Sequence, residues 1–205
     1  MKSIKEPWFE HYSKKYDKIE MDDHLFKDWL KDEEKYLKVV SEYVKPNCKI
    51  LESGCGLGRT AIFMSRMGYK VTAIDDNKKM LDLAKNNAKK FGKNIKFKLV
   101  DLENVDKFFK KNSFDAITHQ GILEHFPPNN IKEIIKKELK IAPLVIFSVP
   151  ILSERNKKYF KGGLIKYRNL WNINFWERIL KDFNVVEIFE AKQRKDDLIV
   201  VIKRS

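Results

Sequence analysis

Two acidic residues stand on either side of a group of closely spaced glycines in the segment that reads KILESGCGLGRTAIFMSRMGYKVTAID. Glu52 ends a short apolar stretch, Gly54, Gly56 and Gly58 follow at every second position, and Asp75 ends a second apolar stretch. Glycine lacks Cβ, so its backbone adopts positive φ angles and lets a ligand lie directly against the chain. A carboxylate at the end of the second stretch can accept hydrogen bonds from both hydroxyls of a ribose. The segment therefore predicts a site for a nucleoside derivative.

The glycine spacing separates the possible nucleotide ligands. A dinucleotide-binding loop has the pattern G-x-G-x-x-G, which requires a glycine where Arg59 stands. The pattern E-x-G-x-G-x-G instead resembles motif I of the class I S-adenosylmethionine-dependent methyltransferases. The resemblance covers roughly residues 45–205 and implies that this loop and its two acids hold S-adenosyl-L-methionine. The alternative is a tight turn that binds no ligand.

Other positions match the same family. The resemblance implies that the Asp101 carboxylate accepts a hydrogen bond from the adenine amino group. The backbone N–H of Leu102 would donate a hydrogen bond to the adenine ring. A helix N-cap is the alternative role for Asp101. Met80 follows the ribose-binding acid by about one helical turn, and it would pack on the adenine or belong to the core. The neighbouring Asp76 is also expected at the cofactor.

The segment FDAITHQGILEHF, residues 114–126, resembles motif IV and the segment after it in small-molecule methyltransferases. The resemblance implies that His119 and Gln120 lie beside the methionine part of the cofactor, whereas Asp115 ties neighbouring backbone. Methyl transfer from a sulfonium is a one-step in-line displacement, so a general base is needed only when the acceptor is protonated. His125 is the first candidate for that base and His119 the second. A histidine without a catalytic role is the alternative for each.

Residues 8–45 have the apolar spacing of helices, in which Trp8, Tyr12 and Tyr16 recur at every fourth position. Many members of the family close such a helix over the cofactor. Tyr16 is therefore expected to contact the cofactor, and core packing is the alternative.

After residue 47, apolar stretches alternate with amphipathic ones, which favours an α/β fold. The resemblance implies a three-layer Rossmann-like sandwich with a seven-stranded, mostly parallel sheet and an antiparallel last strand. A helical cap of residues 1–46 would precede the methyltransferase domain of residues 47–205. Strands are expected at 49–52, 70–75, 95–100, 114–118, 143–149, 184–191 and 196–204. Helices are expected at 59–67, 78–91, 103–110, 130–140 and 174–181.

Particular residues are expected at the ends of these helices. Gly68 and Gly92 stand just past two C-termini, where a left-handed cap belongs. Asn129 and Asn130 suit the N-cap of a following helix. Residues 150–170 read as a loop-like insertion before the last helix.

Two features of the sequence indicate the class of methyl acceptor: motifs of other methyltransferase classes that are missing, and the insertion at residues 150–170. The pattern (D/N/S)-P-P-(Y/F/W) of nucleobase methyltransferases is missing after the fourth strand, as is the paired-glutamate loop of protein arginine methyltransferases. These absences favour a small-molecule acceptor. The insertion combines basic and aromatic residues, which predicts an anionic or aromatic acceptor, with a solvated loop as the alternative. The residues concerned are Arg155, Lys157, Lys158, Tyr159, Phe160, Lys161, Lys166, Tyr167 and Arg168.

The composition limits the possible partners. The 205 residues carry a net charge of +13, which allows nucleic acid as a partner. Lysines outnumber arginines 35 to 7, however, and arginine is preferred where phosphates are bound in pairs, so nucleic acid is not favoured. No apolar run approaches the ~20 residues of a membrane span. Cys48 and Cys55 are expected as reduced thiols of a cytoplasmic protein, and no metal site is expected.

Three other functions stay open at this point. The first is a methyltransferase that acts on RNA or protein. The second is a protein that binds S-adenosyl-L-methionine without catalysis. The third is a nicotinamide-dependent oxidoreductase, against which Arg59 and the two closing strands argue.

Overall fold

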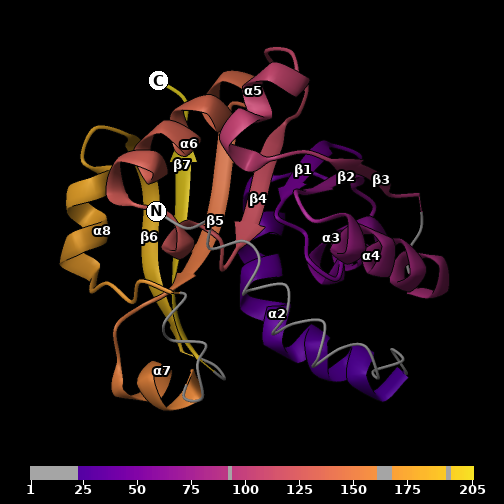
Figure 1. Ribbon diagram of the computed structural model, residues 1–205, viewed down its shortest axis with the longest axis horizontal. Coiled ribbons are helices and arrows are strands. Elements are labelled where there is room, and N and C mark those ends of the chain that lie inside the picture. Colours follow the sequence, from indigo (N-terminus) through magenta and orange to yellow (C-terminus); the bar gives the residue numbers. More distant parts are fainter. Residues whose placement is uncertain (1–22, 92–93, 161–167, 193–194) are drawn as a thin grey trace.

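Seven strands form one mixed sheet, which confirms the expected α/β fold class (Figure 1). The computed structural model describes residues 23–91, 94–160, 168–192 and 195–205. The strand order is β3-β2-β1-β4-β5-β7-β6; β7 runs antiparallel to β5 and β6, and the other neighbouring strands are parallel. The strands are β1 (Lys49–Ser53), β2 (Lys70–Asp75), β3 (Lys96–Leu99), β4 (Ala116–Gln120), β5 (Leu144–Pro150), β6 (Asn184–Lys192) and β7 (Asp196–Lys203). Their bounds agree with the expected ones to within two residues.

Helices cover both faces of this sheet (Figure 1). On one face lie α2 (Asp23–Tyr43), α3 (Arg59–Arg66) and α4 (Lys78–Phe91). On the other lie α5 (Val105–Phe108), α6 (Pro128–Ile141) and α8 (Ile173–Leu180), and the short α7 (Glu154–Tyr159) follows β5. None of the helices in the described part of the chain is long and apolar enough to cross a membrane.

Alternation along the strands assigns side chains to two separate cores. In β1, Ile50 packs with α2, α3 and α4, while Leu51 packs with the helices of the opposite face. Ile146 and Phe147 divide in the same way in β5. Because both faces are covered, the carboxyl ends of the parallel strands form the edge at which polar loops converge. The strand order reverses between β1 and β4, which makes that point the expected ligand crevice.

The start of α6 differs from the expectation. Asn129 and Asn130 were predicted to cap this helix, but it begins at Pro128, and Pro127 is the N-cap. Proline suits a first helical turn because its fixed φ angle is already helical and it has no N–H to leave unbonded. The Asn130 amide instead donates a hydrogen bond to Glu103, with 2.7 Å between the two atoms.

Two other helix ends can be compared with the sequence. The helix expected over residues 103–110 is shorter and is divided into a 3₁₀ turn, Leu102–Asn104, and α5. Gly68 has the predicted left-handed conformation, with φ of 93°. Gly92 lies outside the described residues.

Part of the insertion is helical, so the expectation of a loop over all of residues 150–170 is wrong at α7. Ser153 caps α7 by accepting a hydrogen bond from the backbone N–H of Asn156 at 3.1 Å. The buried Asn156 amide then donates to the backbone carbonyls of Ile151 and Asp196, at 2.8 and 2.5 Å. These bonds fasten α7 to β5 and β7. The helix was missed because its polar sequence offers no apolar stripe.

The described N-terminal helix, α2, accounts for residues 23–43 of the region expected to be helical. Its buried Tyr36 donates a hydrogen bond to the carbonyl of Ile146, at 2.7 Å, which fixes α2 across the centre of the sheet. Trp8, Tyr12 and Tyr16, which were expected to close over the cofactor, lie outside the described residues. The division into a cap and a domain at residues 46 and 47 therefore stays a prediction.

Candidate functional site

The glycine loop between β1 and α3 leaves bare backbone at the predicted ligand crevice. Gly54, Gly56 and Gly58 all have positive φ, at 64°, 52° and 74°. A Cβ at Gly54 would lie 2.5 Å from the Ile122 side chain, whereas a Cβ at Gly56 would meet only the Met80 methyl, at 3.8 Å. The loop is thus packed from behind at Gly54 and open at Gly56. Met80 lies beside the open position and is itself buried, and its contact with the adenine stays a prediction.

Asp75, at the end of β2, is tied to this loop. Its carboxylate accepts hydrogen bonds from the backbone N–H groups of Gly56 and Asn77, each at 2.9 Å. Burial raises its pKa to about 6, although both hydrogen bonds act in the opposite direction. A carboxylate can accept about four hydrogen bonds, so Asp75 keeps acceptor capacity for the ribose. Asp76 is exposed beside it.

Asp101 and Leu102 lie at the end of β3, near Asp75. The backbone N–H of Val100 donates to the Asp75 carbonyl at 3.1 Å, which holds the two strand ends together. The Asp101 carboxylate caps the 3₁₀ turn by accepting from the Glu103 N–H at 3.0 Å, so the alternative role of an N-cap is confirmed. The adenine contact of Asp101 stays a prediction, and Leu102 is buried.

Glu52, at the end of β1, is a buried acid. Burial, followed by the nearby Glu33 carboxylate, raises its pKa to about 8, while a hydrogen bond with Thr60 acts against this shift. Its Oε2 atom has no hydrogen-bond partner among the described residues. At neutral pH the side chain is therefore mainly protonated and can donate one hydrogen bond.

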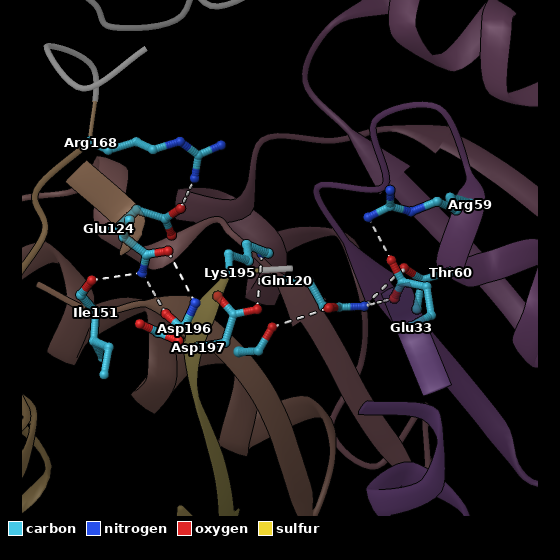
Figure 2. Close-up of polar contacts among 12 residues, drawn as sticks. Glu33, Arg59, Thr60, Gln120, Glu124, Ile151, Arg168, Lys195, Asp196 and Asp197 are labelled. Carbon is cyan, nitrogen blue, oxygen red and sulfur yellow. Dashed lines mark hydrogen bonds and ion pairs between the residues drawn. The ribbon is translucent and has the colours of Figure 1, made fainter. Parts of the chain in front are cut away.

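The sequence reasoning missed Glu33, which lies at the centre of a buried polar cluster (Figure 2). The Glu33 carboxylate is 2.5 Å from the Arg59 guanidinium and accepts from the Thr60 hydroxyl at 3.4 Å. Gln120, at the end of β4, also donates to Glu33 and accepts from the Ser148 hydroxyl at 3.2 Å. The cluster thereby joins α2 and α3 to the ends of β4 and β5. Glu33 was recognisable as an acid on the apolar stripe of α2.

His119 lies on the other face of the sheet from Gln120. Its ring is fully buried, stacks on Phe147 with centroids 5.3 Å apart, and has Nε2 3.3 Å from the Glu138 carboxylate. The Ser53 hydroxyl donates to the same carboxylate at 3.2 Å. Adjacent strand residues point to opposite faces, so Gln120 reaches the cluster and His119 does not. The structure therefore favours the non-catalytic alternative for His119.

His125 follows β4 in the 3₁₀ turn Leu123–His125, close to the carboxyl edge of the sheet. Its Nε2 lies 3.8 Å from the Glu124 carboxylate, which is fully buried and also paired with Arg168. The Glu124 carbonyl accepts two hydrogen bonds from Asn169, both at 2.9 Å. This turn thus fixes the end of the insertion beside His125, and Glu124 was not foreseen as its anchor.

Three of the described cations of the insertion have acidic partners. Arg155 lies 3.6 Å from Asp196, Lys157 lies 2.6 Å from Glu154, and Arg168 pairs with Glu124. The Arg168 guanidinium also stacks over the buried Phe160 ring, 4.8 Å from its centroid. The positive charge of the described insertion is therefore largely neutralised within the fold. Lys158 is exposed, and Lys161, Lys166 and Tyr167 lie outside the described residues.

Comparison with known proteins agrees with this geometry. Residues 50–141 match the family model of a methyltransferase domain. A ubiquinone biosynthesis O-methyltransferase from Pelagibacter ubique is 31% identical over 147 residues, which cover 69% of this chain and 59% of that protein. One from Nitrosococcus oceani is 36% identical over 101 residues, or 49% of this chain and 42% of that protein. The chain thus spans only about half the length of these relatives.

Solved structures share the fold at lower sequence identity. A Pyrococcus horikoshii protein superposes with a TM-score of 0.76 at 17% identity, covering 95% of this chain and 99% of that one. The magnesium protoporphyrin IX methyltransferase of Synechocystis, with bound SAH, gives a TM-score of 0.71 at 20% identity, with coverages of 98% and 95%. At these identities the likeness concerns the fold alone.

Proposed function

We propose that the chain is a class I S-adenosylmethionine-dependent methyltransferase, which transfers a methyl group from S-adenosyl-L-methionine to a small-molecule acceptor. The observation that carries this proposal is the bare backbone at Gly56 beside the fixed carboxylate of Asp75. Both lie at the reversal of strand order, where ligands of open α/β sheets bind.

The residues of the crevice fit this cofactor. Asp75 has acceptor positions left for the ribose hydroxyls, and Met80 offers an apolar surface next to Gly56. Asp101 and Leu102 would hold the adenine at the end of β3. We assign Glu52, the glycine loop and Gln120 to the methionine part. Asp76 and Tyr16 stay predicted contacts, without support from a described interaction.

The cofactor, when bound, supplies a methyl group activated by a sulfonium, so the chain has mainly to orient and desolvate the reactants. The glycine loop and Asp75 fix one side of the crevice. Hydrogen bonds with Glu33 and Ser148 fix the orientation of the Gln120 side-chain amide at the end of β4. His125, next to Glu124, is the candidate to take a proton from an acceptor that carries one.

The nature of the acceptor is part of the proposal. An anionic or aromatic acceptor was predicted from the insertion. Among the described residues of the insertion, the exposed cation Lys158 supports an anionic acceptor, and the exposed ring of Tyr159 supports an aromatic one. Replacing Lys157, Lys158 and Lys161 with alanine should raise the acceptor KM if the acceptor is anionic. An unchanged KM would exclude the anionic form. A cytoplasmic location is likewise proposed, in line with the free thiols of Cys48 and Cys55.

The experiment that tests methyl transfer is the formation of S-adenosylhomocysteine from labelled cofactor. The purified protein is mixed separately with the low-molecular-weight filtrate of a cell lysate and with its retained macromolecules. Label transfer to the filtrate alone is the expected result. Transfer to retained RNA or protein would contradict the proposed acceptor class, and cofactor binding without transfer to either fraction would contradict catalysis.

A further inference from the structure

Asp197, near the start of β7, lies on the face of the sheet that α2 covers. In the register of the sheet, Asp197 lies opposite Pro150 and Ile199 lies opposite Ser148. Because residues two apart in a strand share a face, Asp197 points to the same face as Ile199, which packs in the core under α2. Ser148 bonds Gln120 on that face. In Figure 2, Asp197 lies on the opposite side of Gln120 from Glu33 and Thr60.

One oxygen of the Asp197 carboxylate has a partner within the fold, and the other oxygen has no hydrogen-bond partner among the described residues. Oδ2 lies 3.1 Å from the Lys195 ammonium. Oδ1 is buried and has no hydrogen-bond partner among the described residues. Burial raises the pKa of Asp197, and the carboxylates of Glu124 and Glu33 raise it further against the effect of Lys195. A buried acceptor oxygen without a partner is costly, so the position suits a ligand that donates a hydrogen bond.

Glu124 provides a second, independent observation of the same kind. Its side chain is fully buried, and one carboxylate oxygen, Oε1, is paired with Arg168. The other, Oε2, is buried and has no hydrogen-bond partner in the described part of the chain. The pair lies over the bare backbone of Gly121, where a Cβ would be 3.4 Å from Oε1 and 3.5 Å from the Arg168 guanidinium. Gly121 directly follows Gln120, so Glu124 lies at the carboxyl end of β4, next to the polar cluster.

We propose that Asp197 and Glu124 bind a hydrogen-bond donor of the methyl acceptor, either a hydroxyl or a protonated amine. The inference rests on the proposed methyl transfer, because it assigns these residues to the acceptor's part of the crevice. Lys195 and Arg168 each occupy one oxygen of the two acids and hold the other free for the ligand. An acceptor carboxylate or phosphate would be repelled at this point. The donor requirement concerns one end of the acceptor and is compatible with an aromatic ring elsewhere.

Three probes with the same phenyl body test this inference. They are 2-phenylethylamine, 2-phenylethanol and 3-phenylpropionate, which differ in carrying an ammonium, a hydroxyl or a carboxylate. Each is titrated into the protein saturated with S-adenosylhomocysteine, and binding is followed through the backbone amide signals in NMR spectra. The variants are Asp197→Asn and, as a matched control, Asp196→Asn. Asp196 is the adjacent buried acid, and it pairs with Arg155 of α7.

The expected result is that the amine or the alcohol shifts the amide signals of β7 and of residues 120–124 at lower concentration than the carboxylate does. Asp197→Asn should weaken that binding by about tenfold, since it removes a charged hydrogen-bond acceptor. Asp196→Asn should leave it unchanged. If the amine binds and the alcohol does not, the donor is an ammonium; the reverse outcome identifies a hydroxyl.

Three results would overturn the inference. The first is a preference for 3-phenylpropionate, and the second is an Asp197→Asn variant that keeps the wild-type preference. The third is the absence of shifts near Asp197 with both donor probes. Binding of S-adenosylhomocysteine to both variants, measured by calorimetry, separates these results from a failure of the proposed function. If the cofactor product binds and the probes do not, only the assignment of the acceptor end is wrong.

Discussion

The two halves of the crevice are built in different ways. The cofactor half is centred on one continuous unit, β1–α3–β2, which supplies the glycine loop and Asp75. The proposed acceptor half brings together Glu124 after β4 and Asp197 of β7, which are far apart in the sequence. Each of these two acids is paired with a cation, Arg168 or Lys195. A local unit can be predicted from a sequence, whereas ion pairs between residues far apart in the sequence cannot.

The largest effect is expected from breaking an ion pair of the acceptor half. Arg168→Met would leave the fully buried Glu124 carboxylate without its cation, at a cost of about 3–5 kcal/mol in the free energy of unfolding. The double variant Glu124→Gln, Arg168→Met should recover most of that loss. Denaturant unfolding of the two variants and the wild type measures both quantities. A loss below about 1 kcal/mol in Arg168→Met would mean that the pair is not buried as described.

The cofactor half should be most sensitive at Gly54. Gly54→Ala adds a methyl 2.5 Å from Ile122 at a φ of 64°, so overpacking and backbone strain together should cost about 3 kcal/mol. Gly56→Ala is the matched control, since its nearest neighbour is the Met80 methyl at 3.8 Å, and it should cost only about 1 kcal/mol. Thermal unfolding would distinguish them. Equal losses would show that the space behind Gly54 is not filled as described.

Glu52 should make stability depend on pH. Its pKa in the folded chain is about 8 against 4.5 for the ordinary side chain, so the folded state keeps a proton that the unfolded state releases. The free energy of unfolding should therefore fall as the pH rises from 4.5 to 8, by at most about 1.4 kcal/mol per pH unit. Glu52→Gln should remove this slope. An identical pH profile in the variant would contradict the buried, protonated state.

The smallest effect expected is a change of cofactor affinity with pH. Asp75 has a pKa of about 6, so its carboxylate loses charge and one acceptor position as the pH falls through that value. Affinity for S-adenosyl-L-methionine should be constant above this range and weaken below it. Calorimetry across the range measures the change. An affinity that is independent of pH would indicate that Asp75 does not bind the ribose.

The difference between the two halves also explains what the sequence could predict. Glu52, the glycines and Asp75 follow one another at fixed spacing, so both the strand–loop–helix unit and its ligand class could be inferred. The alternating apolar stretches likewise indicated all seven strands. These features depend on local chain geometry, which the order of residues determines directly.

The acceptor half was largely missed because it depends on register and long-range pairing. His119 was predicted at the cofactor from its position in the motif. Because His119 and Gln120 are neighbours in β4, their side chains point to opposite faces of the sheet, and that of His119 lies beside Glu138. Asp197 was read only as part of a strand, although the antiparallel register brings it beyond Ser148. Glu33 and Glu138 did leave a signal, since each is an acid on an otherwise apolar helix face.

Calorimetric titration with S-adenosyl-L-methionine tests the central claim most directly. The wild-type chain is compared with Asp75→Asn and with Asp82→Asn, whose aspartate is half-buried on α4 and pairs with Lys78. Saturable binding to the wild type and to Asp82→Asn is expected, with an affinity lower by about tenfold in Asp75→Asn. Absence of binding to the folded wild-type chain, or equal affinity in all three proteins, would contradict the assignment of the glycine loop and Asp75 to this cofactor.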